Sequence, residues 1–259
     1  MPNANPPSTP DRPPSTSRPS DDVDLTGSIQ AVDALSEAER AEMQSLMADY
    51  FENVSPAHFR ADLEEKERVI LLRDNSGRIR GFSTMMRFTI PFDGEDVVGI
   101  FSGDTIIDRA CWGTPLLPQL WAKLAFRWSD AVPHDRVYWL LLSAGYKTYR
   151  FLPVFFETFY PRHDVATPPD QQRLLDTLAS ARYPEAYDSA DGVVRLDHPT
   201  PLRSGVAPPT ERRRQNPHVA FFLEANPDYP EGDELVCLAQ VQRSNLTRAG
   251  RRMVRRSSS

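Results

Sequence analysis

A short polar group interrupts an otherwise apolar, strand-like stretch in the first half of the chain. Residues 97–107 are rich in Val, Ile and Phe, but Ser102, Gly103, Asp104 and Thr105 stand in their middle. A buried polar side chain is costly without a hydrogen-bond partner, and a glycine inside a strand is typical of a bulge or of a close approach by a ligand. Asp104 could accept a proton from a substrate amine as a general base. The alternative is a structural aspartate, bonded to nearby backbone or to an arginine.

The end of this strand leads straight into a turn and a new helix. Arg109 and Gly113 lie in the turn, and Pro115 is acceptable only in a first helical turn. Apolar side chains then recur at helical spacing from Leu116 to Trp128. The unpaired N–H groups and the partial positive charge of a helix N-terminus favour anions, so Arg109 and Gly113 are candidate phosphate contacts.

Cys111 lies in the same turn, where a helix N-terminus could lower its pKa and make it a nucleophile. That role needs a partner base, and none of the five histidines stands in a recognisable pairing motif. The histidines show no metal-ligand spacing, and the two cysteines form no CxxC pair. We therefore expect ordinary histidines and no metal site.

Composition limits the classes of protein that the chain can represent. A formal charge of −6 over 259 residues argues against a general nucleic-acid binder, and no apolar run approaches the roughly 18 residues of a membrane span. The N-terminus lacks the apolar region of a secretory signal, so a cytoplasmic protein is expected. Residues 1–24, rich in Pro and Ser, are expected to be disordered, and 243–259 to form a solvated basic tail. That tail could touch RNA or an acidic partner, but it lacks aromatic side chains for stacking.

Local patterns predict a mixed set of helices and strands around the central strand. A capping box at Ser36 and the pair Ser55-Pro56 each begin an amphipathic helix. The predicted strands are a short one near 29–32, an antiparallel meander of 69–72, 79–90 and 97–107, and a buried strand at 137–142 that runs parallel to the third strand of the meander.

The second half of the chain is predicted in less detail. An aromatic-rich segment after Ser143 is expected to be partly helical and to be divided by Pro153. Residues 161–217 are expected to form an irregular insertion with one helix at 169–181. Apolar runs at 218–223 and 235–241 predict a final hairpin. Residues 25–242 are thus expected to form a single domain.

This order of elements resembles the GNAT superfamily of acyl-CoA-dependent N-acyltransferases over about residues 28–160 and in the final hairpin. The resemblance implies an α+β fold with a mixed, mostly antiparallel sheet flanked by helices, and acetyl-CoA or another acyl-CoA as co-substrate. In that family a glycine-containing loop after the fourth strand holds the CoA pyrophosphate. Its place is taken here by residues 109–115, so Arg109, Gly113 and Thr114 are the implied cofactor contacts.

The resemblance also implies a catalytic mechanism and an acceptor. Asp104 would serve as the base for an amine of a small molecule or a protein. A tyrosine after the fifth strand would protonate the leaving thiolate, and Tyr149, with Tyr146 as a second candidate, matches by position. The turn has one glycine and a proline without an N–H, which favours an alternative: a GNAT-like binding or interaction protein without CoA chemistry. A third alternative is other chemistry in the same cleft, through Cys111.

Overall fold

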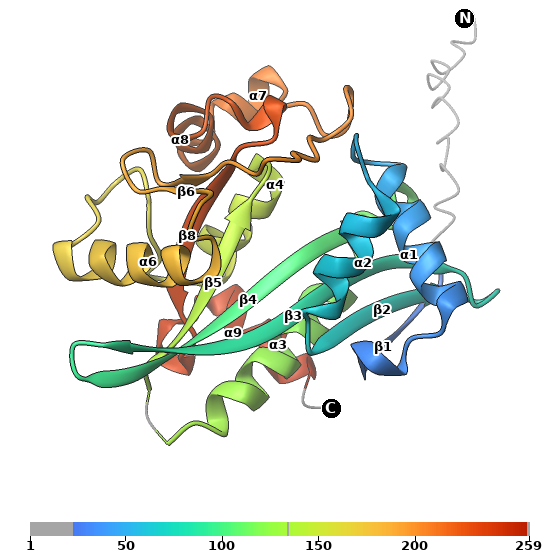
Figure 1. The fold of residues 1–259 in the computed structure, drawn as a ribbon, viewed down its shortest axis with the longest axis horizontal. Coiled ribbons are helices and arrows are strands. Elements are labelled where there is room, and N and C mark those ends of the chain that lie inside the picture. Colours follow the sequence, from blue (N-terminus) through green and yellow to red (C-terminus); the bar gives the residue numbers. More distant parts are fainter. Residues whose placement is uncertain (1–22, 134, 258–259) are drawn as a thin grey trace, which may run out of the picture.

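One mixed sheet runs through the molecule and is covered by helices on both faces (Figure 1). The structure is a computed structural model, which describes residues 23–133 and 135–257. Within this part the eight strands lie in the order β1-β2-β3-β4-β5-β8-β7-β6. The strands are β1 (Leu25–Ala31), β2 (Arg68–Asp74), β3 (Ile79–Phe92), β4 (Glu95–Ile107), β5 (Val137–Ser143), β6 (Tyr187–Asp188), β7 (Val193–Val194) and β8 (Glu234–Gln240). Only β4 and β5 pair in parallel, so the predicted α+β, mostly antiparallel sheet is confirmed. Of residues 1–24, which are predicted to be disordered, 1–22 lie outside the described residues.

Two layers of helices enclose the sheet. The helices of the described residues are α1 (Glu37–Ala48), α2 (Pro56–Glu64), α3 (Leu116–Asp130), α4 (Tyr146–Tyr149), α5 (Phe151–Phe155), α6 (Pro169–Arg182), α7 (Glu211–Arg214), α8 (Pro217–Ala225) and α9 (Arg248–Ser257). α1, α2 and α6 contribute to the hydrophobic clusters on one face, and α3, α5, α8 and α9 to the cluster on the other. The capping box of α1 forms as predicted, because the Ser36 hydroxyl accepts from the N–H of Glu39, whose side chain accepts from Ser36 N. No helix of residues 23–133 and 135–257 is long and apolar enough to cross a membrane.

The polar break in the central strand is a β-bulge. Ser83 of β3 pairs with Thr105 and Met85 pairs with Ser102, so two residues of β4 stand opposite one of β3. Glycine is needed at the first bulged position, Gly103, since a Cβ there would lie 2.5 Å from Thr84 Oγ1 and 2.7 Å from Lys66 Cε. The bulge reorients the side chains that follow it on β4.

The sheet opens beside this bulge. β4 and β5 pair from Val98 with Val137 up to Ser102 with Leu141, and the ladder ends there. β4 continues to Ile107 while β5 gives way to α4. The two central strands therefore part at the point where the bulge lies.

Two predictions about the C-terminal region are wrong. The apolar run at 218–223 is helix α8, because Asn216 caps its N-terminus and Pro217 occupies its first position. A short apolar run does not distinguish a buried strand from a helix by its pattern. The final hairpin is therefore absent from the described residues, and β8 pairs with β5 and β7 instead.

The second error concerns residues 243–259, which do not form a free tail in their described part. α9 packs against α3 and α5 and buries Met253 and Val254. Gly250 permits close packing, because a Cβ there would lie 2.4 Å from the carbonyl oxygen of Phe155. Two adjacent apolar residues among arginines are too short a pattern to reveal this docked face. Within 161–217 the predicted helix is α6, and the hairpin β6–β7 extends the sheet past β8.

Candidate functional site

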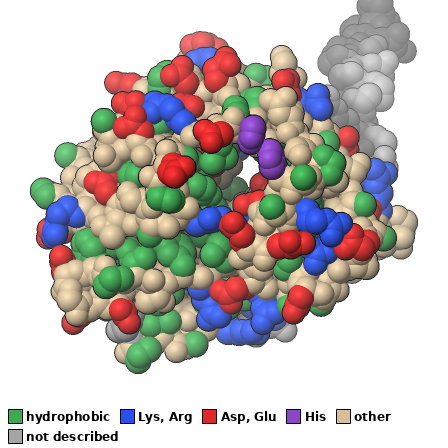
Figure 2. Space-filling model, in the orientation of Figure 1, with side chains coloured by type: hydrophobic (Ala, Val, Ile, Leu, Met, Phe, Trp, Pro, Cys, Tyr) green, Lys and Arg blue, Asp and Glu red, His purple; other side chains and the backbone are tan. Residues whose placement is uncertain are grey.

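A central cavity of about 250 Å³ lies where β4 and β5 part. Its wall includes side chains from the clusters on both faces, so the cavity passes through the sheet. Figure 2 shows the molecule hollowed on one face, beside histidine and acidic side chains. His58 and His198 line the cavity and stack with ring centroids 4.6 Å apart. The cavity thus gives a ligand access to the middle of the sheet.

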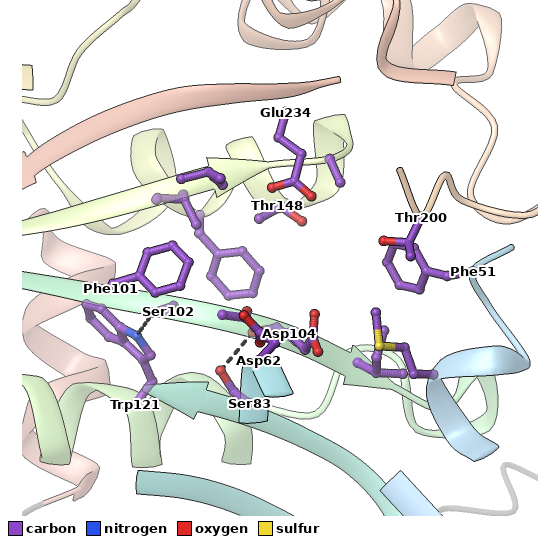
Figure 3. A pocket seen from close by; sticks show the side chains of 18 of the residues that line it. Phe51, Asp62, Ser83, Phe101, Ser102, Asp104, Trp121, Thr148, Thr200 and Glu234 are labelled. Atoms are coloured by element: carbon purple, nitrogen blue, oxygen red, sulfur yellow. Dashed lines mark hydrogen bonds between the residues drawn. The ribbon is translucent and has the colours of Figure 1, made fainter. Parts of the chain in front are cut away.

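Three carboxylates define the acidic end of the central cavity: Asp62 of α2, Asp104 of β4 and Glu234 of β8. In Figure 3 Asp62 and Asp104 lie together, and Glu234 points toward them from the opposite wall. Burial raises the pKa of Asp104 to about 7, with a further rise from Asp62 and an opposing effect of Lys66. Burial also raises the pKa of Glu234 to about 8, and the charges of Asp104 and Asp62 add to this rise. Asp104 and Glu234 therefore change charge near neutral pH.

Two cations pair with Asp62 at the acidic end: the buried Lys66 and, at 3.8 Å, the partly buried Arg182. Lys66 is 4% exposed, and its Nζ lies 2.6 Å from Asp62 Oδ1 and 2.9 Å from the carbonyl oxygen of the same residue. The ammonium group therefore compensates Asp62. Among the described residues, none makes a hydrogen bond or an ion pair with the side chain of Asp104 or Glu234. These two carboxyl groups are available to a ligand.

The opposite, apolar end of the central cavity is built around two tryptophans. Trp121 of α3 and Trp139 of β5 have ring centroids 4.3 Å apart, and both indole N–H groups donate to Ser102 Oγ, at 2.8 and 3.0 Å. Phe156 and Met253 complete this part of the wall. Since the one hydroxyl satisfies both indoles, this end is apolar toward the cavity.

An outer cavity of about 270 Å³ adjoins the central one along the end of β4. The two share Thr105, Ile106 and Thr148 in their walls. Lys147 lines the outer cavity, with its Nζ 3.2 Å from the centroid of the Trp112 ring. Burial lowers the pKa of Lys147, and the positive charges of Arg109 and Arg213 lower it further.

Three cations lie in or beside the outer cavity and are called the basic rim here. Lys147 lines the cavity, and the charge of Arg213 acts on Lys147. Arg109 contacts the lining residues Trp112 and Gly205. Neighbouring like charges disfavour one another and favour an anion. An anion bound there would relieve their repulsion. The outer cavity can therefore accept a ligand with negative charge at one end and an uncharged part that extends inward.

The structure places the predicted phosphate contacts beside this rim. The Arg109 side chain donates to the carbonyl oxygen of Gly205 at 3.1 Å and lies over the Trp112 ring. Gly113 has a φ of +96°, which glycine adopts without strain. Thr114 Oγ1 accepts from the N–H of Leu116 at 3.3 Å, so its hydroxyl is already engaged at the start of α3.

Other predicted residues lie away from the central cavity. Tyr149 is fully buried, donates its hydroxyl to the carbonyl oxygen of Pro161 at 2.9 Å and lines neither cavity. A role as acid toward the cavity does not fit that position. Tyr146 lines the outer cavity, and Cys111 is buried outside both. Two hydroxyl-bearing residues line both cavities: Thr105, whose hydroxyl is bonded to Ser83 Oγ, and Thr148.

Sequence reasoning missed Asp62, Lys66 and Glu234. Glu234 precedes an apolar strand, and a charged residue at the edge of such a run was the available signal. Asp62 and Lys66 are spaced i and i+4 on a run of charges that looks fully solvated. Within residues 23–133 and 135–257, no group of three or more His, Cys, Asp or Glu side chains is arranged to hold a metal ion.

No protein-family model and no curated protein matches this chain. Among solved structures it is similar to a GNAT family N-acetyltransferase from Escherichia coli in complex with CoA, at 17% identity over 47% of this chain and 64% of that one, with a TM-score of 0.34. A probable N-acyltransferase from Enterococcus faecalis has 13% identity, coverage of 52% of this chain and 33% of that one, and a TM-score of 0.39. Glucosamine-6-phosphate N-acetyltransferase from Arabidopsis thaliana has 14% identity, coverage of 44% and 81%, and a TM-score of 0.34.

The match spans less than two thirds of the Escherichia coli and Enterococcus faecalis chains. At these identities and TM-scores the similarities carry no conclusion about family or function. The predicted α+β fold with a mixed, mostly antiparallel sheet is confirmed by the strand order of the structure itself.

Proposed function

We propose that this protein transfers an acyl group from a CoA thioester to an amine. The observation that carries the proposal is the central cavity, which crosses the sheet where β4 and β5 part and holds two unpartnered carboxyl groups on one side. An amine can approach from the acidic end, which is open to solvent beside His58 and His198. A thioester that enters through the outer cavity meets it at the bulge.

The basic rim supports the binding of the CoA phosphates. Pro115 and Pro118 remove two N–H donors from the start of α3, so backbone donors are fewer there than in an ordinary helix N-terminus. Arg109, Lys147 and Arg213 supply charge in the same region. In this arrangement side-chain cations take over much of the role of the backbone N–H groups, and the pantetheine arm follows the outer cavity to Thr148.

The acidic end supports proton transfer in the attack step. The amine must lose a proton before its lone pair attacks the thioester carbon, and Asp104 or Glu234 can accept that proton because each has a pKa close to neutral pH. The C–S bond then breaks, an amide forms, and the sulfur leaves as a thiolate that takes up a proton. The Thr148 hydroxyl lies where both cavities meet and can donate a hydrogen bond to that sulfur.

A second candidate is a protein that binds CoA thioesters or amines without transferring the acyl group. The two prolines at the start of α3 favour it, because they weaken the phosphate site. This candidate requires the same cavities but not the raised carboxyl pKa values.

Thermal unfolding with acetyl-CoA, followed by an assay of thiol release with a panel of primary amines, tests the proposal. A ligand at about 100 times its Kd should add about 2.7 kcal/mol, or roughly 5 °C or more in Tm. Lys147→Ala should reduce that shift, whereas Lys123→Ala, an exposed position of α3, should leave it unchanged. Binding with amine-dependent thiol release supports the transferase, and binding without release with any amine supports the second candidate. No shift with acetyl-CoA, longer acyl-CoA or CoA would contradict the transferase, and no shift with the amines either would contradict the second candidate as well.

A further inference from the structure

We infer that the acyl group carried by the donor is a long apolar chain, which lies in the apolar end of the central cavity. The inference rests on the proposed function and specifies its donor. The acidic end lies on the α2 side of the sheet, and the apolar end lies on the α3 and α9 side. A thioester at the bulge stands between the two, so its acyl group can extend away from the amine.

The central cavity as a whole is larger than an acetyl group needs. It measures about 250 Å³, and an engineered apolar cavity of about 150 Å³ already holds a benzene ring. An acetyl group adds a single methyl beyond the carbonyl and would leave most of the apolar wall without contact. The side chains that form this wall are Leu117, Trp121, Trp139, Phe155, Phe156 and Met253.

The chemistry of the wall selects for hydrocarbon. The only polar atoms of its two tryptophans, the indole N–H groups, are both bonded to Ser102 Oγ and offer nothing to a polar ligand. Each methylene removed from water into such a site strengthens binding by about three- to four-fold. A chain of several carbons therefore gains affinity here, whereas a charged or hydroxylated group does not.

The C-terminal helix closes this end. Met253 comes from α9, which docks on the end of α5 through Gly250 and packs along α3. The side chain at position 253 is 7% exposed and belongs to the cavity wall. A larger side chain there should shorten the space for the acyl chain without reaching the basic rim or the acidic end.

Calorimetric titration of the full-length protein with acetyl-, octanoyl- and dodecanoyl-CoA, each below its micelle concentration, tests the inference. We expect octanoyl-CoA to bind at least ten-fold more tightly than acetyl-CoA, and dodecanoyl-CoA at least as tightly as octanoyl-CoA. Equal or weaker binding of both longer donors would overturn the inference. Because this comparison uses the wild-type protein, it does not depend on the folding of a variant.

Substitution at position 253 tests where the acyl chain of the donor lies. Met253→Trp should weaken dodecanoyl-CoA by ten-fold or more and leave acetyl-CoA within about two-fold, while the volume-conserving Met253→Leu should keep both within about three-fold. An equal loss for all donors in Met253→Trp would place the chain elsewhere and contradict the inference. If CoA and acetyl-CoA bind but chain length adds nothing, only this inference fails; if no CoA compound binds, the proposed function itself fails.

Discussion

The two ends of the central cavity lie on opposite faces of one sheet and differ in how their polar atoms are treated. At the apolar end, the indole N–H groups of Trp121 and Trp139 both bond to Ser102. At the acidic end, the side chains of Asp104 and Glu234 find no partner among the described residues, and their pKa values are raised. The polar atoms of the apolar end are thus hydrogen-bonded within the protein, whereas two carboxyl groups of the acidic end are not. Buried titratable groups of this kind are typical of binding and catalytic sites.

Both ends depend on one local irregularity of β4. In a regular strand Ser102 and Asp104 would point to the same face, because side chains alternate with a period of two. The bulge opposite Thr84 breaks this alternation, so that Ser102 meets α3 while Asp104 meets the carboxylate of Asp62 on α2. The polar stretch 102–105 is unfavourable in a regular strand. Here it separates the proposed place of the acyl donor from that of the amine acceptor.

The largest expected effect comes from Asp104→Asn. Without a hydrogen-bond partner to lose, this variant should keep its Tm within a few degrees, and turnover with an amine should fall by roughly 10²–10⁴-fold, the range of a positioned general base. Steady-state kinetics beside a thermal melt measure both quantities.

Asp62→Asn is the matched control for Asp104→Asn. Its carboxylate pairs with the buried Lys66, so the change should lower the stability by about 1–3 kcal/mol. A lower Tm in Asp104→Asn together with an unchanged turnover of the folded protein would contradict the role of Asp104 as a base. Asp104 would then be a structural residue.

Ser102→Ala should destabilise the apolar end of the central cavity. Removal of the hydroxyl leaves two buried indole N–H groups unpaired, at about 1–3 kcal/mol for each, so we expect a loss of roughly 2–6 kcal/mol and a Tm lower by at least roughly 4 °C. Ser83→Ala, which removes a single bond to Thr105 Oγ1 on the other side of the bulge, should cost only about 1 kcal/mol. Equal effects in chemical denaturation would remove the special role of Ser102.

The acidic end should make the stability fall as the pH rises. A carboxyl group whose pKa is raised on folding stabilises the protein fully below about pH 4, and this contribution is lost as the pH rises through about 7 and 8. Between pH 5 and the folded pKa of each carboxyl group, we expect the stability to fall by up to about 1.4 kcal/mol per pH unit for that group. Asp62 raises the pKa of both carboxyl groups, Asp104 and Glu234, and Lys66 opposes the rise at Asp104.

The double variant Asp104→Asn/Glu234→Gln should flatten this decline, as followed by denaturant unfolding at each pH. The difference between parent and variant isolates the pair, since other titrating groups, such as His218, are common to both. A parallel pH profile in the variant would show that the decline has another source.

The sequence was sufficient for the elements before Ser143, because caps, turns and alternating apolar residues are local signals. The polar break also drew attention to Asp104, which lines the central cavity and whose role stays a prediction. The bulge was also indicated locally, by Gly103. The two ends of the central cavity could not be predicted from the sequence. Glu234 and Met253 reach the cavity from elements that are distant in the chain, and no local pattern encodes which side chains meet across a sheet. Tyr149 matched the resemblance by its position along the chain, whereas its ring is buried against Phe159, Phe221 and Phe222, contacts that no local pattern encodes.

The smallest expected effect concerns the basic rim, which we propose to bind the phosphates of the acyl-CoA donor independently of both ends of the central cavity. Arg109→Ala removes one cation of the basic rim, and we expect acetyl-CoA to bind about five- to thirty-fold more weakly, or about 1–2 kcal/mol. The loss is limited because Lys147 and Arg213 remain and the Arg109 side chain is also engaged with Gly205. Since the charge acts on phosphates, the factor should be the same for dodecanoyl-CoA, should shrink at high salt, and should leave turnover at saturation unchanged.

Arg78→Ala, at an exposed arginine remote from both cavities, is the matched control and should change neither donor. Unchanged affinity for acetyl-CoA in Arg109→Ala would remove Arg109 from the phosphate site. A factor that grows with chain length would mean that the rim and the apolar end are not independent, because the arginine would then also be fixing the outer wall through Trp112. Calorimetry at two salt concentrations distinguishes these outcomes, since only a phosphate contact is screened.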